Sequence, residues 1–314
     1  MRMADGTRST EPEAHGGATL ERTPRDILIG SLLVLAGGAM WGVNGTVSKI
    51  LMSDYAIAPE WIACVRQLAA GLIFLACAAI ATPRKLSGAV RDVRSWPSLL
   101  ANAVVCVLLV QVAYLTSIDL TNSGTATVLQ SLNLLFVLLY TCVRGRRGPN
   151  AREGLGVAFA LVGVVLIATG GNLGTLSLPP AGLAWGLVNA LSTAALAITP
   201  LKLIAKWGAF VTNGVMFVVS GLFMLPFVRP WEHMPPLDAR GWGLMAFTVL
   251  AGTFGAFWLF LVGSMKAGPM RATMLGTMEP VMATVSAVLW TSAVFTPVDL
   301  TGFALIIIMV FLVR

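Results

Sequence analysis

Charged residues are scarce in this chain. Asp, Glu, Lys and Arg make up 11% of its 314 residues, whereas hydrophobic residues make up 57%. A soluble domain carries about 25% charged residues, so the composition excludes an ordinary soluble fold. A bilayer, in contrast, accommodates apolar helices of roughly 20 residues each. The composition therefore predicts an integral membrane protein.

Groups that could build a catalytic or metal centre are also few. The two histidines, His15 and His233, lie in a polar tail and a loop. The four cysteines all fall in apolar segments, and none has a partner at metal-ligand spacing. The HExxH, GxSxG, GxGxxG and P-loop patterns are absent. We therefore expect no cofactor, no metal and no enzymatic activity.

Ten apolar runs account for most of the chain, and strand-like alternation with period 2 is absent. The runs cover 27–47, 60–81, 97–118, 122–143, 153–170, 181–201, 209–228, 241–264, 269–294 and 299–313. Residues 1–24 are polar and predict a disordered cytoplasmic tail rather than a signal peptide. We predict an all-α membrane protein with ten transmembrane helices.

The basic residues predict how these helices are oriented. Although the net charge is +7, the Lys and Arg residues lie between apolar runs and form no nucleic-acid-binding patch. They gather in alternate connections, around 84–94, 144–152, 202–206 and 266–271, on the side of the N-terminus. Because basic loops stay in the cytoplasm, we predict a multi-pass inner-membrane protein with both termini cytoplasmic.

The chain contains an internal repeat. The segment 126–134 resembles 272–280 at an offset of 146 positions, which places Asn133 opposite Glu279. Trp41-Gly42 and Trp185-Gly186 also correspond, near the start of each half. Because each half holds five spans, the second copy must enter the membrane inverted. Two inverted five-helix repeats, 25–171 and 178–314, are an architecture of secondary transporters, whose substrate sites lie near the midplane between the repeats.

These residues resemble a known family. The paired Trp-Gly motifs, Arg66, Tyr114 and the segment Leu275-x-x-x-Glu279-Pro280 are similar to the EamA-type pattern of the drug/metabolite transporter superfamily. The resemblance covers about 25–313. It implies export or exchange of small metabolites, often amino acids or amphiphilic compounds, through the inner membrane. The first half departs from the pattern, with Asn133-Leu134 where the family often has a proline.

Two charged residues fall inside the predicted spans. Glu279 is the only carboxylate between Met270 and Val294, about ten residues or 15 Å from the cytoplasmic end of its helix. A charged acid at that depth costs about 2.5–3.5 kcal/mol. We expect Glu279 to face a cavity, or to cap backbone groups freed by Pro280. Arg66 either attracts an anionic substrate group or snorkels to the outer surface.

Eight further residues are polar or aromatic and lie away from helix ends: Trp41, Asn44, Tyr114, Gln130, Asn133, Trp185, Asn189 and Trp258. They either line a central cavity together with Glu279 and Arg66, or bridge helices by hydrogen bonds. We predict that all ten residues bind substrate.

The sequence thus predicts a secondary transporter of small organic metabolites, including amino acids or amines, working by alternating access in the lipid bilayer. Proton coupling and the oligomeric state stay open. Two alternatives also stay open at this point: an intramembrane enzyme acting on lipid-linked substrates, and a membrane scaffold without transport activity.

Overall fold

A computed structural model describes residues 23–313 of the chain. Over this range the secondary structure is helical, without strands. The tail predicted over 1–24 lies outside the described residues except for Thr23 and Pro24. Thr23 caps the first helix by accepting a hydrogen bond from the backbone N–H of Asp26, and α1 begins at Pro24.

The helices follow the predicted apolar runs closely. Those of the first half are α1 (Pro24–Tyr55), α2 (Pro59–Ala81), α3 (Pro83–Arg91), η1 (Val93–Ser95), α4 (Trp96–Ala101), η2 (Asn102–Val107), α5 (Leu108–Leu120), α6 (Ser123–Gln130), α7 (Asn133–Arg144) and α8 (Ala151–Thr169). Those of the second half are α9 (Pro180–Ile198), α10 (Leu201–Trp207), α11 (Ala209–Val228), α12 (Ala239–Val249), η3 (Leu250–Gly255), α13 (Ala256–Ala267), α14 (Pro269–Leu275), α15 (Met278–Thr291) and α16 (Pro297–Leu312).

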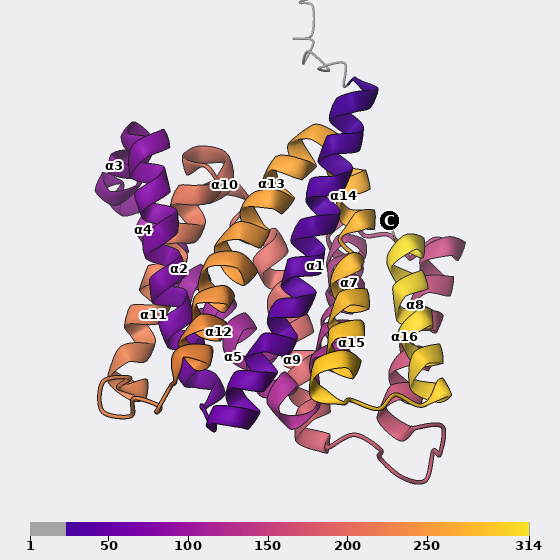
Figure 1. Cartoon of the computed structure of the whole chain (residues 1–314). Coiled ribbons are helices and arrows are strands. Elements are labelled where there is room, and N and C mark those ends of the chain that lie inside the picture. Colours follow the sequence, from indigo (N-terminus) through magenta and orange to yellow (C-terminus); the bar gives the residue numbers. More distant parts are fainter. Residues whose placement is uncertain (1–22, 314) are drawn as a thin grey trace, which may run out of the picture.

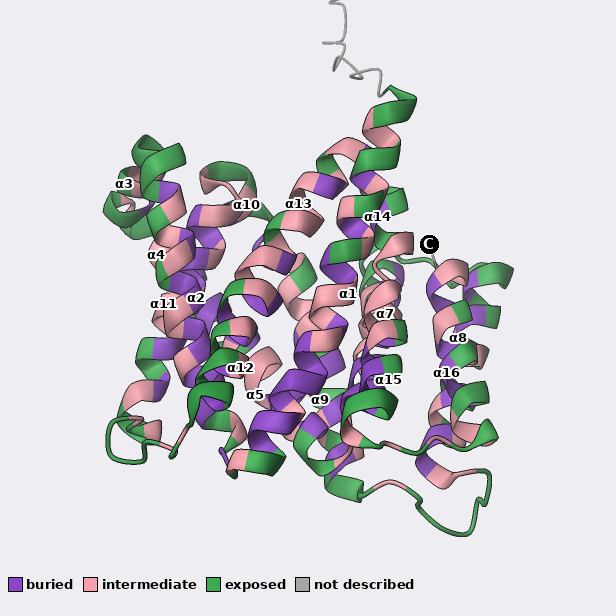
Figure 2. Ribbon diagram, viewed as in Figure 1, coloured by how far each residue is buried: buried purple, intermediate pink, exposed green. Residues whose placement is uncertain are grey.

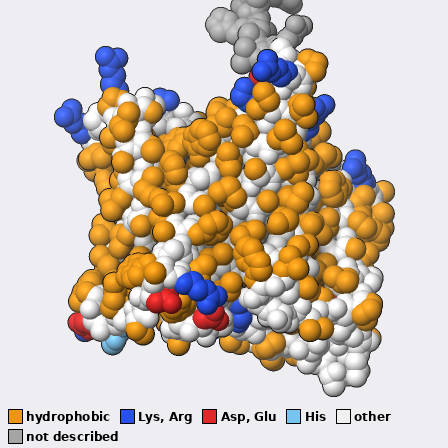
Figure 3. All heavy atoms as spheres, viewed as in Figure 1, with side chains coloured by type: hydrophobic (Ala, Val, Ile, Leu, Met, Phe, Trp, Pro, Cys, Tyr) orange, Lys and Arg blue, Asp and Glu red, His pale blue; other side chains and the backbone are white. Residues whose placement is uncertain are grey.

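Within residues 23–313, nine helical segments are long and apolar enough to cross a membrane, and α16 adds a shorter apolar helix. The start of α1 and the end of α16 lie at the same end of the bundle (Figure 1). We call this end the N-side and the opposite end the far side. On the face shown in Figure 3, hydrophobic side chains cover the middle and charged ones gather at the two ends. The predicted all-α fold is confirmed, and the nine long helical segments together with α16 are compatible with the ten predicted spans.

The two halves pack through equivalent pairs of helices. α1 packs against α13, and its counterpart α9 packs against α5. The pairs α2 and α11, and α8 and α16, each join equivalent helices of the two halves, and α6 packs against α15 of the span that corresponds to α6 and α7. This exchange of partners is the pattern of a two-fold axis between inverted repeats.

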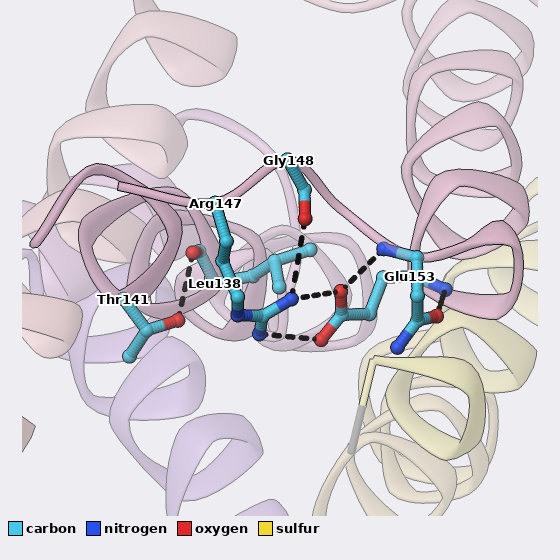
Figure 4. Close-up of polar contacts among 6 residues, drawn as sticks. Leu138, Thr141, Arg147, Gly148 and Glu153 are labelled. Atoms are coloured by element: carbon cyan, nitrogen blue, oxygen red, sulfur yellow. Dashed lines mark hydrogen bonds and ion pairs between the residues drawn. The ribbon is translucent and has the colours of Figure 1, made fainter. Parts of the chain in front are cut away.

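Local irregularities recur in both halves as well. The π-helices η2 and η3 interrupt corresponding spans. The helices α8 and α16 both begin with a capping box, formed by Asn150 with Glu153 and by Thr296 with Asp299. In the first box, Arg147 also binds the Glu153 carboxylate through two hydrogen bonds of 2.7 and 2.8 Å (Figure 4). These bonds hold the connection between α7 and α8 against the start of α8.

The buried core consists of three clusters, and the buried residues lie where helices face one another (Figure 2). The largest contains Leu51, Phe74 and Tyr114 from the first half together with Met224 and Met245 from the second. The other two clusters also draw residues from both halves. The interface between the halves is therefore the core of the protein, and the cavity described below lies within it.

Candidate functional site

Two membrane-spanning helices are broken at equivalent positions. The first break separates α6 from α7 at Ser131 and Leu132, and the second separates α14 from α15 at Gly276 and Thr277. At each break the backbone tightens into a turn in which Leu132 N–H binds Leu129 O at 3.1 Å and Thr277 N–H binds Met274 O at 3.3 Å. Broken helices within a membrane are tolerated where the freed backbone lines a cavity or is buried in protein.

Pro280 lies four residues after Gly276, where a proline disfavours a continuous helix through the second break. It is the third residue of α15, where a backbone N–H would have no partner within the helix. The first break has Leu134 at the equivalent position and forms without a proline. Gly276 O, the carbonyl that Pro280 cannot bind, accepts instead from the backbone N–H of Glu279 at 3.1 Å, so the Glu279 carboxyl is not needed as its cap.

Two adjoining cavities meet at these breaks. Their volumes are about 210 and about 400 Å³. Both are lined by Trp41, Gln130, Asn133 and Glu279, which therefore stand between them. α1 and the two broken helices thus bring five of the predicted site residues to the wall of the larger cavity: Glu279, Asn133, Gln130, Trp41 and Asn44.

A chain of polar contacts joins Glu279 to the opposite repeat. Asn189 Nδ2 donates to Gln130 Oε1 at 2.9 Å, and Gln130 Nε2 lies 3.5 Å from Glu279 Oε1. Thr193 Oγ1 extends the chain with a 3.3 Å bond to Asn189 Oδ1. Gln130, from the first half, therefore links the carboxyl group at the α14–α15 break to α9 of the second half.

Arg66 lies inside the protein and does not snorkel. Its exposed fraction is 3%, it lines the larger cavity, and its Nη2 donates to Gln111 Oε1. Tyr114 lines the same cavity and shares a 2.8 Å hydrogen bond with Thr127. Seven of the ten predicted residues, these two included, therefore surround one space.

Asn44 is held in this wall by the π-helix η3. Its Nδ2 donates to Gly252 O at 3.3 Å, and a Cβ added at Gly252 would lie 2.7 Å from Asn44 Cβ. Only glycine leaves room for this contact, so the sequence position of Gly252 helps to place Asn44.

The other three predicted residues lie off the wall. Asn189 is fully buried and acts on the cavity through Gln130. Trp185 is partly buried and is not a lining residue of either cavity. Trp258 is 45% exposed on the outer surface, because its neighbours Phe257 and Phe260 occupy the inward face of α13. Substrate binding by these residues stays a prediction.

The structure also adds lining residues that the sequence analysis did not single out. Gln111, Thr193 and Asn213 are polar, and Phe257 and Phe260 supply aromatic surface. The ring centroids of Phe260 and Trp41 are 5.1 Å apart. Gln111 and Asn213 could have been found by the rule applied to Gln130, since each is an amide within an apolar run.

The cavities extend toward the N-side and end before the far side. Thr273 and Val310, on the wall of the smaller cavity, lie within a few residues of the N-side ends of α14 and α16. Toward the far side, Thr46 Oγ1 makes 2.7 Å hydrogen bonds to both Ser123 Oγ and Ser286 Oγ. We call Thr46, Ser123 and Ser286 the hydroxyl cluster. Its members are at most 3% exposed and close the space between α1, α6 and α15.

A duplicated, inverted bundle with broken helices around a central polar cavity defines the class of membrane transporters. The sequence model of the EamA-like transporter family matches this chain twice, over residues 28–169 and 180–314. The chain belongs to the EamA-like transporter family.

A relative and a solved structure agree with this assignment. The chain is 30% identical over 287 residues to a protein of Salmonella typhimurium strain LT2 described as the uncharacterized inner membrane transporter YicL, covering 90% of this chain and 94% of the relative. A crystal structure of a protein matches with a TM-score of 0.60 at 14% identity, covering 92% of this chain and 97% of the other, and shows the shared fold. The protein is a multi-pass membrane transporter of the inner membrane.

Proposed function

We propose that this protein is a secondary transporter that carries small organic metabolites, amino acids or amines, across the inner membrane by alternating access. One observation carries the proposal: Glu279 lies at a helix break, on the wall of a cavity between the repeats that extends to the N-side and is closed toward the far side. A site reached from one side at a time is what alternating access requires.

In this proposal, the charge on Glu279 is the variable that couples substrate to conformation. The carboxyl lies at the start of α15, where the N-terminal end of the helix favours a negative charge, while the apolar surroundings favour the neutral form. Protonation would weaken its attraction for a cationic substrate group. Through Gln130 and Asn189 that change reaches α9 in the second half.

The test is substrate flux against pH in proteoliposomes, for wild type and Glu279→Gln, over a panel of amino acids and amines. We expect Glu279→Gln to fold and to bind substrate but to lose the pH dependence of transport. Glu60→Gln, at an exposed carboxylate near the start of α2, is the matched control and should keep the wild-type profile. Equal rates and equal pH profiles for all three proteins would leave Glu279 no role in coupling. Flux itself separates transport from the enzyme and scaffold alternatives.

The proposal places the N-side, and with it both termini, in the cytoplasm. The support is the excess of Lys and Arg in the connections of that side. Reporters fused after Arg94, Arg147, Lys206 and Arg271 should report the cytoplasm, and reporters near Asp54, Gly174 and His233 the outside. A reporter at Arg147 that reads outside would reverse the orientation.

A further inference from the structure

Arg66 is a buried cation without an anionic partner. Five ion pairs occur among the described residues, and none of them includes Arg66. Its one hydrogen bond among these residues goes to the neutral amide of Gln111. The Nε atom is fully buried and has no acceptor within the described part of the chain.

A guanidinium group in this position must keep its charge, since arginine does not lose its proton in proteins. Burying an unpaired charge is costly, and such charges are normally paired or face a functional space. Arg66 cannot reach the membrane surface, because its side chain is buried and directed to the cavity wall. The cavity is the place from which an anion can reach it.

We propose that Arg66, positioned by Gln111, binds the carboxylate of the transported substrate. This inference rests on the proposed transport function and narrows its substrate class from amino acids or amines to amino acids. The charge balance of the cavity supports a zwitterion, because its wall carries one base, Arg66, and one acid, Glu279, which form no ion pair with each other. A phosphate dianion would meet a single cation and be repelled by Glu279.

The rest of the cavity matches this assignment. Its volume of about 400 Å³ suits a molecule of amino-acid size, and Phe74, Phe217 and Phe257 provide an apolar wall for a side chain. The carboxyl of Glu279 on the same wall is the counterpart for an ammonium group. The guanidinium supplies the donor geometry that fits a carboxylate.

The experiment compares three pools of compounds on the purified full-length protein: the twenty common L-amino acids, their methyl esters, and the amines formed by their decarboxylation. Binding is measured as the concentration dependence of thermal stabilisation, and transport as flux in proteoliposomes. We expect only the amino acids to bind wild type tightly. Esters and amines should bind about ten- to hundredfold more weakly, the value of one charged hydrogen bond.

Arg66→Gln should bind the amino acids as weakly as wild type binds the esters, and Arg66→Lys should recover part of the difference. Arg240→Gln, an exposed arginine paired with Asp54 on the far side, is the control and should behave as wild type. If Arg66→Gln fails to fold, the affinities of wild type for the amino acids, the esters and the amines still test whether the substrate carboxylate is recognised.

Amines or esters that bind wild type as well as amino acids, or no binding by any pool, would overturn the role of Arg66. So would full affinity of a folded Arg66→Gln for the amino acids. Selective binding of amino acids without flux would uphold the role of Arg66 and count against transport alone. Flux of amines that bind wild type as tightly as amino acids do would uphold transport and count against the role of Arg66.

Discussion

The first helices of the two halves, α1 and α9, are equivalent in the repeat but are packed differently. Toward the far side, α1 lies against α15 backbone to backbone: a Cβ at Gly42 would stand 2.7 Å from Ala283 N and would also collide with Glu279 O. In the repeat, Gly42 corresponds to Gly186, which lies in α9 six residues after Pro180. A Cβ at Gly186 would meet only side-chain atoms of Leu129 and Ser117.

The hydroxyl cluster follows the same asymmetry. Thr46, Ser123 and Ser286 correspond in the repeat to Ala190, Pro269 and Tyr140. Only Tyr140 has a hydroxyl, and its side chain is 43% exposed. A symmetric scaffold thus carries one closed end and one end without a comparable set of contacts. The difference in packing depends on a glycine and three hydroxyl groups, so single substitutions can test each contribution.

The largest effect should come from Gly42→Ala. The added methyl overlaps the α15 backbone, and overpacking of this kind costs about 1–3 kcal/mol. Gly186→Ala should cost less, because the end of Leu129 can move aside. Thermal unfolding of both variants in the same detergent checks the ranking, with Gly154→Ala, which meets nothing within 4 Å, as the control. Equal losses at Gly42 and Gly186 would mean that α1 and α9 are packed equally tightly at these positions.

The next effect should come from Thr46→Val, which keeps the shape of the side chain but removes the hydrogen bonds to Ser123 and Ser286. Each bond is worth about 1 kcal/mol, so the balance should move toward a far-side-open form by roughly five- to thirtyfold. Spin labels at Ser53 and at the 88%-exposed Val294 report the distance across the far side, after Cys77 is replaced by alanine.

The control for this measurement is Thr301→Val, whose hydroxyl bonds only to Pro297 O of its own helix. An unchanged distance distribution in Thr46→Val would show that the hydroxyl cluster does not hold the far side closed.

A smaller effect is expected for Pro280→Ala, which compares the two broken helices. Because the α6–α7 break forms without proline, the α14–α15 break should persist. The loss should be about 0.4–1 kcal/mol, from greater freedom of the unfolded chain. Thermal stability and flux close to wild type are the expected results. A loss of transport with normal stability would give the proline a role that its partner position lacks.

The smallest effect concerns the surface contact between α3 and α10 on the N-side. A hydrogen bond from Lys206, with a second from Ser95, holds the pKa of Asp92 below its ordinary value of 3.8. The contact therefore stabilises the protein above that pH and is lost as the pH falls through the lowered pKa. The difference in Tm between wild type and Asp92→Asn should be small at pH 7 and vanish in strong acid. A difference that persists there would not come from this charge.

The fold could be predicted from the sequence because apolar runs and the repeat offset determine it. The run 209–228 coincides with α11. The predicted run 27–47 ends where polar residues begin, yet α1 continues to Tyr55, because the Ser48 hydroxyl bonds to Asn44 O within the helix. The repeat offset also located the cavity wall, because the corresponding residues Asn133 and Glu279 both follow a helix break and both line the cavity.

The remaining features depend on local geometry that periodicity does not reveal. The π-helix η3 precedes α13 and turns the following residues out of the regular α-helical phase, so Trp258 faces outward and Phe257 inward. Which end of the cavity is closed was also hidden, because the repeat makes the two ends equivalent in pattern. It depends on contacts such as Thr46 with Ser286, between residues 240 positions apart.

The shared core clusters have a consequence for how the chain is made. Leu51 and Phe74 reach their final neighbours only when Met224 and Met245 have been synthesised, and α8 must wait for α16. We therefore expect that neither half folds as a separate unit. During synthesis, we expect lipid to contact the inner faces of the first five helices until the second five are inserted and pack against them. When the halves 23–171 and 178–313 are expressed separately, each should be degraded. When they are expressed together, both should persist, because each half supplies the packing partners of the other.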